Sequence, residues 1–85
     1  MKAELRLEMA KKIAEKIYKN DQRTIDGVIA VVKGNKLRYF HKVLPVALAN
    51  DICDHLEFPR YRYASKIAGV IQNYHDKEKK ENLPG

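Results

Sequence analysis

The sequence holds few of the residue types that mark several classes of protein. Its 85 residues include one cysteine, no tryptophan, three prolines and four glycines. Because Cys53 is the only cysteine, the chain forms no internal disulfide, which argues against a secreted, disulfide-rich domain. It has neither a run of about 18 apolar residues nor a signal-peptide core, which excludes a membrane-spanning helix. We therefore expect a protein of the reducing cytoplasm with no membrane partner.

Motifs that carry catalysis are absent as well. The sequence has no phosphate-cradling glycine-rich loop, no serine nucleophile elbow and no pair of carboxylates set in an apolar pocket pattern. Cys53 and His55 stand two residues apart on an expected helix and point to different sides, so they form no metal site. Asp51 and Asp54 share a helix face but lack a third ligand, which is typical of a solvated surface. We expect a non-catalytic protein without metal or cofactor.

Basic residues are what the sequence has in excess. Seventeen Lys and Arg oppose 11 Asp and Glu, which gives a formal charge of +6 and a pI near 9.5. This balance favours an anionic partner such as nucleic acid, although many soluble domains without one are equally basic. The charge is uneven: residues 45–58 carry −3, whereas residues 1–19, 20–44 and 59–85 carry +3 each. Residues 45–58 are therefore an acidic segment within a basic chain.

Apolar spacing predicts a single α+β domain over residues 1–75, followed by a charged, disordered tail at residues 76–85. The first expected element is an amphipathic helix at residues 3–19, whose apolar positions recur at helical spacing. These positions are Leu5, Met9, Ala10, Ile13, Ala14 and Ile17. Lysines occupy most of the opposite face, which we interpret as solvated because glutamates lie among them.

The next expected element is a two-stranded antiparallel β-hairpin. A β-branched run at residues 28–32 and a second run at residues 37–43 flank the turn KGNK at residues 33–36, and Gly and Asn tolerate the positive φ of tight turns. The first strand is apolar on both faces, and a two-stranded ribbon is marginal alone. Either a second copy covers one face, in a homodimer formed through the hairpin, or helices of the same chain cover both.

Two helices, at residues 45–56 and 60–76, are predicted after the hairpin. Pro45 suits a first helical turn and forces Leu44 out of helical geometry. Apolar residues then follow the pattern of a helix-turn-helix unit: a small residue in the first helix, an apolar end, a plug in the turn and positions that pack back. These residues are Ile52, Cys53, Leu56, Phe58, Pro59, Tyr63 and Ile67. Over residues 46–74 the chain therefore resembles the helix-turn-helix superfamily.

This resemblance implies double-stranded DNA binding, as in a small homodimeric transcription regulator, with helix 60–75 in the major groove. Outward side chains of that helix suit guanine and adenine edges; they are Arg62, Ser65, Lys66, Gly69, Gln72 and Asn73. Gly69 lets a backbone approach closely, although a merely tolerated helix glycine explains it equally well. The expected phosphate contacts are Arg60, Tyr61, Ser65 and, at the hairpin tip, Lys33 and Lys36. Glu57 stands where such turns often carry Gly and would have to adopt left-handed geometry.

Acidic side chains on the first helix of the pair favour a different function. Asp51, Asp54 and Glu57 would repel phosphates where that helix usually crosses the DNA backbone. The alternative is a non-catalytic protein-interaction subunit of a replication, transcription or other nucleic-acid complex, whose acidic face binds a basic protein partner. A third hypothesis is an RNA or single-strand binder, in which Tyr61 between Arg60 and Arg62 stacks on bases.

Overall fold

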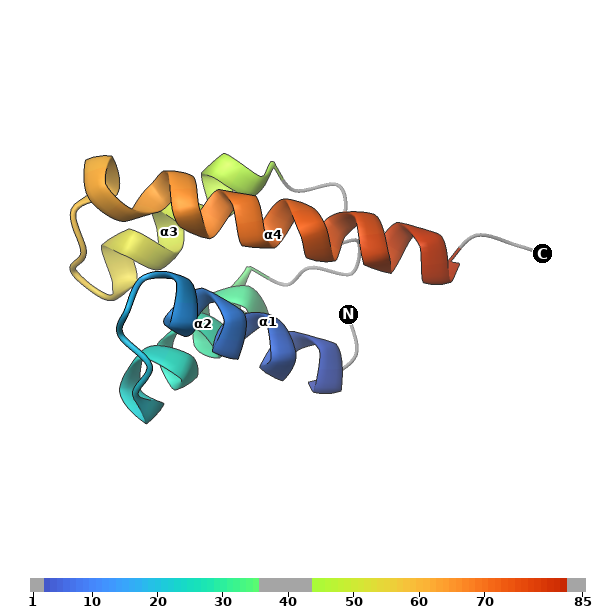
Figure 1. The fold of residues 1–85 in the computed structure, drawn as a ribbon, viewed down its shortest axis with the longest axis horizontal. Coiled ribbons are helices and arrows are strands. Elements are labelled where there is room, and N and C mark those ends of the chain that lie inside the picture. Colours follow the sequence, from blue (N-terminus) through green and yellow to red (C-terminus); the bar gives the residue numbers. More distant parts are fainter. Residues whose placement is uncertain (1–2, 36–43, 83–85) are drawn as a thin grey trace.

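The structure, a computed structural model, describes residues 3–35 and 44–82, which form four α-helices and no β-strand (Figure 1). The helices are α1 (Ala3–Lys16), α2 (Gln22–Gly34), α3 (Pro45–His55) and α4 (Arg60–Asn82). The predicted α+β class is therefore wrong for the described residues. The helices expected in the first segment and on either side of the Phe58-Pro59 break are confirmed.

The predicted first β-strand is part of α2. Ile25, Val28 and Val32 stand at i, i+3 and i+7, and all three are buried in the core. Asp21 caps the helix, because its side chain accepts a hydrogen bond of 2.8 Å from the backbone N–H of Thr24. The β-strand preference of branched residues spans only about 1 kcal/mol. Burial of one such side chain contributes roughly 1.5–3 kcal/mol, so packing decides the conformation.

The predicted hairpin turn is the end of this helix. Gly34 is the last residue of α2, and Asn35 caps it with a φ of −76°, which is not the positive φ of a hairpin turn. The backbone N–H and the side-chain Nδ2 of Asn35 both donate to the carbonyl oxygen of Val31, at 3.1 and 2.7 Å. The predicted second strand and Lys36 lie outside the described residues. Dimerisation through a hairpin loses its basis, since its first strand is helical.

One core joins the helices in a closed circuit. α1 packs against α2 and α4, and α3 packs against the same two helices (Figure 1). The largest side chains that are completely buried come from all four helices: Met9, Ile13, Val28, Leu48, Ile52, Ile67 and Ile71. Every apolar position predicted for the first helix is buried. α4 continues to Asn82, so residues 76–82, expected as a disordered tail, are helical.

α3 and α1 end in the same way, with a residue in the left-handed region. At the end of α3, Glu57 has a φ of 59°, and the N–H of Phe58 donates to the carbonyl of Cys53 at 2.8 Å. At the end of α1, Tyr18 has a φ of 57°, and the N–H of Lys19 donates to the carbonyl of Ala14 at 2.9 Å. This geometry usually belongs to Gly. The conformation predicted for Glu57 is confirmed, whereas that of Tyr18 was not expected.

Candidate nucleic-acid interface

The outward face of α4 is assembled as the sequence predicts. Its residues are exposed and stand opposite the buried Ile67, Ile71 and Tyr74. They are Arg62, Ser65, Lys66, Gly69, Gln72 and Asn73. Gln72 Nε2 donates to Asp76 Oδ1 at 3.1 Å, so this amide is already engaged on the helix. Arg62 lies over the ring of Tyr63, with its guanidinium carbon 5.5 Å from the ring centroid.

Arg60, at the start of α4, is paired with an acidic residue of α3. Its Nε and Nη2 donate to the two carboxylate oxygens of Asp54, the first at 2.9 Å. The hydrogen bond from Arg60 lowers the pKa of the Asp54 carboxyl below its ordinary value. Arg60 is therefore not a free phosphate ligand, and Asp54 contributes less repulsion than the sequence suggests. Asp51 and Glu57 remain exposed.

Of the other predicted contacts, Tyr61 is suitably exposed, whereas Lys33 lies away from the surface of α4. Tyr61 is 93% exposed, as a stacking or phosphate contact requires. Lys33 is exposed near the end of α2, which, among the described helices, packs on α1 and α3 but not on α4. Lys33 is therefore not part of the surface formed by α4. Lys36 lies outside the described residues, and the wing-like hairpin tip expected from the two lysines is not formed by residues 33–35.

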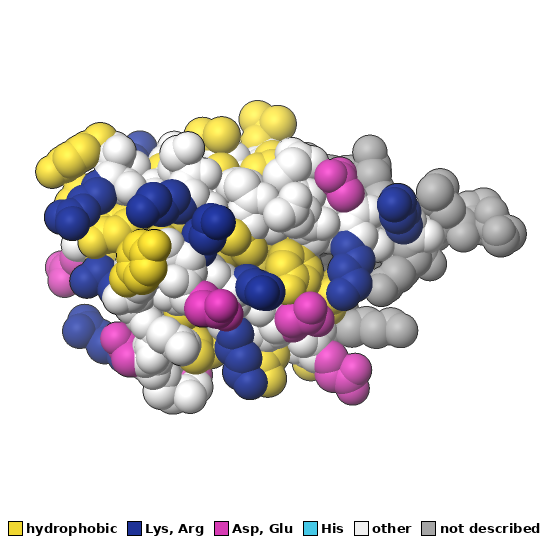
Figure 2. Space-filling model, viewed as in Figure 1, with side chains coloured by type: hydrophobic (Ala, Val, Ile, Leu, Met, Phe, Trp, Pro, Cys, Tyr) yellow, Lys and Arg dark blue, Asp and Glu magenta, His cyan; other side chains and the backbone are white. Residues whose placement is uncertain are grey.

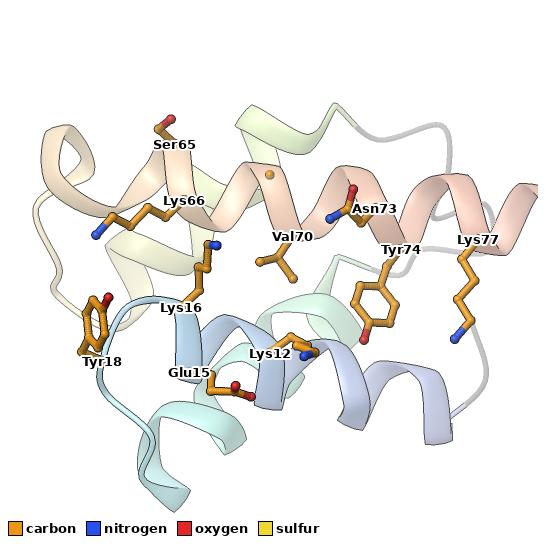
Figure 3. A pocket seen from close by; sticks show the side chains of 11 residues that line it. Lys12, Glu15, Lys16, Tyr18, Ser65, Lys66, Val70, Asn73, Tyr74 and Lys77 are labelled. Atoms are coloured by element: carbon orange, nitrogen blue, oxygen red, sulfur yellow. The ribbon is translucent and has the colours of Figure 1, made fainter.

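A groove between α1 and α4 joins four of the six residues of the predicted face to residues that sequence reasoning left aside (Figure 3). From α4 it takes Ser65, Lys66, Gly69, Val70, Asn73, Tyr74 and Lys77, and from α1 and its end Lys12, Glu15, Lys16 and Tyr18. Lysine and arginine side chains spread across this face of the molecule, with acidic side chains interspersed, most of them over its lower half (Figure 2). The groove is basic, because four lysines line it with one glutamate.

A polar cluster lies at the end of the groove near Lys77. The hydroxyl of Tyr74 donates to Glu8 Oε1 at 3.0 Å, and Lys77 Nζ lies 3.7 Å from the same oxygen. Burial and, second, the hydrogen bond to Glu8 raise the pKa of Tyr74 to about 12. Tyr74 is therefore protonated at neutral pH. The positive charge of the groove is concentrated away from this end.

Lys12, Lys16 and Lys66 supply that concentrated charge. Among the described residues, none of the three has a carboxylate within ion-pair distance. Lys66 Nζ instead lies 5.5 Å from the centroid of the Tyr18 ring. Three ammonium groups without acidic partners form a surface suited to phosphate oxygens.

Tyr18 is the residue that sequence reasoning missed. It is 88% exposed, and the left-handed backbone at residue 18 holds its ring at the groove. The only sequence signal for its position is the end of the apolar stripe of α1 at Ile17, just before the loop residues Asn20 and Asp21. That signal places Tyr18 at a helix end but does not bring it near Lys66, which is far along the chain.

The described residues contain no group of three His, Cys, Asp or Glu side chains that could hold a metal ion. Within residues 3–35 and 44–82, no helix is both long and apolar enough to cross a membrane. Comparisons of this chain with protein-family models, with curated proteins and with solved structures find no match. The surface of α4 and the groove beside it are therefore the features that bear on function, and membership of the helix-turn-helix superfamily stays a prediction.

Proposed function

We propose that the protein binds double-stranded DNA, with the outward face of α4 in the major groove, as in a small transcription regulator. The observation that carries the proposal is the exposed face of α4, on which Arg62, Lys66 and Asn73 stand within three turns of one helix. Arg and Lys donate to guanine edges, and Asn pairs with adenine.

The dimensions of α4 suit this role. Its 23 residues make a helix of about 35 Å at 1.5 Å per residue. A helix about 10–12 Å across fits a major groove that is about 12 Å wide. Because Gln72 is bonded to Asp76, we assign base reading mainly to Arg62, Lys66 and Asn73, and phosphate contacts to Ser65 and Tyr61.

The Arg60–Asp54 pair weakens the main objection to DNA binding. An acidic α3 would repel the phosphate backbone, but one of its exposed carboxylates accepts both hydrogen bonds of a guanidinium. The lysines beside α4 further offset Asp51 and Glu57. The buried thiol of Cys53 fits the cytoplasmic location that goes with this proposal.

Fluorescence anisotropy with random-sequence duplex, single-stranded DNA and RNA tests the proposal directly. We expect duplex to bind best, with a log-log salt slope of about −3 to −6. Arg62→Ala/Lys66→Ala should weaken duplex binding well beyond the matched control Arg23→Ala/Lys33→Ala, which removes the same charges from α2. Absence of duplex binding at low salt, or equal losses in the two double variants, would contradict the proposal.

A second candidate function, a protein-interaction subunit, is favoured by the outer face of α3. Val46 is 60% exposed, Leu44 just before the helix is 72% exposed, and Asp51 is exposed on the same helix, so this surface offers apolar and acidic contacts. Such a subunit would leave bare duplex unbound at low salt. Its partner binding would be lost in Val46→Ser/Asp51→Asn and unchanged in Arg62→Ala/Lys66→Ala.

A further inference from the structure

The groove beside α4 has two walls that come from distant parts of the chain. Lys66 and Asn73 stand on the α4 side, and Lys12 and Lys16 stand on the α1 side (Figure 3). Between them, Val70 forms a largely buried floor. A sugar–phosphate strand alternates anionic phosphates with less polar sugars, so a groove with lysine walls and an apolar floor complements it.

The position of this groove suits a protein that places α4 in the major groove of duplex DNA. A helix in the major groove is flanked by the two phosphate backbones that border it. Because α1 packs along one flank of α4 (Figure 1), the strand on that flank would meet α1. Lys12 and Lys16 are therefore placed where phosphates would come.

Gly69 leaves room at the centre of the groove. A Cβ built on Gly69 meets no other atom within 4 Å, so packing inside the protein does not require glycine there. Glycine weakens a helix interior. Packing therefore does not explain why residue 69 is glycine. The space that it leaves suits the close approach of a nucleic-acid backbone.

Tyr18 ends α1 as Glu57 ends α3, but its side chain, unlike that of Glu57, lines the groove. Its backbone adopts the left-handed region, which glycine occupies without steric cost, while its side chain is almost fully exposed. Strained residues of this kind persist where the surrounding structure holds them, often at binding sites. The ring stands beside Lys66, so its hydroxyl and that ammonium group face the same end of the groove.

We propose that the α1–α4 groove holds the sugar–phosphate backbone of the bound duplex, with Lys12 and Lys16 on its phosphates and the Tyr18 hydroxyl donating to a phosphate at one end. This inference rests on the proposed function and extends it, because it makes α1 part of the DNA interface. Glu15, the one carboxylate of the lining, is outnumbered by the lysines around it. These contacts are to the backbone, so they strengthen binding to all duplex sequences equally.

Salt titrations of duplex binding distinguish the two proposals. Lys12→Gln/Lys16→Gln should make the log-log salt slope less negative by about 1.8, at about 0.9 for each phosphate contact, to a similar extent for every duplex sequence. The matched control Lys11→Gln/Lys33→Gln removes the same charge from positions outside the groove and should change the slope little. If wild type binds duplex but the two double variants behave alike, the groove inference is overturned while α4 binding stands. If wild type binds no duplex, the proposed function itself fails.

Tyr18→Gly provides a second test that misfolding cannot imitate. Glycine fits the left-handed backbone, so the melting temperature should rise, whereas duplex affinity should fall by about 2- to 10-fold, as expected for the loss of one hydrogen bond. Tyr18→Phe keeps the ring and should show a similar loss of affinity. Unchanged affinity in both variants would remove Tyr18 from the interface and overturn its part of the proposal.

Discussion

Gly27 and Gly69 differ in what surrounds them: Gly27 of α2 lies against Leu56 at the end of α3, whereas Gly69 of α4 lies exposed on the groove between α1 and α4. At the first, a Cβ on Gly27 would overlap Leu56 Cδ2, so a larger residue there must displace that methyl group. At the second, a Cβ on Gly69 would meet nothing within 4 Å. Packing explains glycine at position 27 but does not explain glycine at position 69. The difference separates a position that the fold requires from one that is free to serve binding.

The largest expected effect on stability comes from adding a side chain at Gly27, which lies against Leu56. Gly27→Val forces branched methyl groups against Leu56, and overpacking of this kind lowers the free energy of unfolding by about 1–3 kcal/mol. Chemical denaturation measures it. Gly69→Val is the matched control and should cost far less, because its side chain enters open space. Equal losses at the two positions would show that the contrast between the contact and the groove is not real.

The next largest effect is expected at the two left-handed helix ends, Glu57 after α3 and Tyr18 after α1. Glu57→Gly and Tyr18→Gly each place glycine in a left-handed backbone, and each should raise the free energy of unfolding by about 1 kcal/mol. Thermal melts compare the two variants. Only Tyr18→Gly should also weaken duplex binding, since Glu57 lies outside the groove. A loss of affinity in Glu57→Gly would place the turn before α4 in the interface as well.

Gly69→Ala tests the open groove with the smallest change that can be made there. Alanine should raise the free energy of unfolding by about 0.5–1 kcal/mol, because it is the better helix former and meets no neighbour. Duplex affinity should fall if a DNA backbone passes over this point. A more stable protein with unchanged affinity would mean that the space above Gly69 is not used by DNA.

The stability that Tyr74 contributes, at the end of the groove near Lys77, should depend on pH only under alkaline conditions. Burial and Glu8 raise the pKa of Tyr74 from its ordinary value of 10 to about 12. The folded protein therefore holds this proton more tightly than the unfolded chain, so the stability from this group is present below pH 10 and is lost as the pH rises to 12. Tyr74→Phe should remove that loss without changing the pH dependence below 9. A wild-type stability that stays level from pH 10 to 12 would contradict this.

The helical periodicity of the sequence predicted α1, α3 and α4, and it was present in α2 as well. Ile25, Val28 and Val32 fall on one helical face, but their branched side chains and the Gly34-Asn35 pair favoured a hairpin. The error came from weighing β-preference and turn chemistry above spacing. The length of α4 was missed for the opposite reason, since its charged last turns carry no apolar pattern that predicts a helix.

The residues of the candidate site were likewise predictable only in part. The outward residues of α4 were predictable, because one helix and its 3.6-residue period decide which side chains face away from the core. Lys12, Lys16 and Tyr18 were not, because nothing local to α1 indicates which surface its lysines will share. The Arg60–Asp54 pair was missed for a related reason: it depends on the angle between α3 and α4 across the turn.

The sequence by itself determined α1, α3 and α4, their buried faces and the basic balance of charge, because these follow from residue spacing and composition within short segments. The helix-turn-helix pattern also indicated the left-handed backbone of Glu57. Only the tertiary structure decided that α1 lies along α4 and that lysines more than 50 residues apart line one groove. The reason is physical: side chains buried between helices set how the helices pack, and exposed side chains are carried to wherever that packing leaves them.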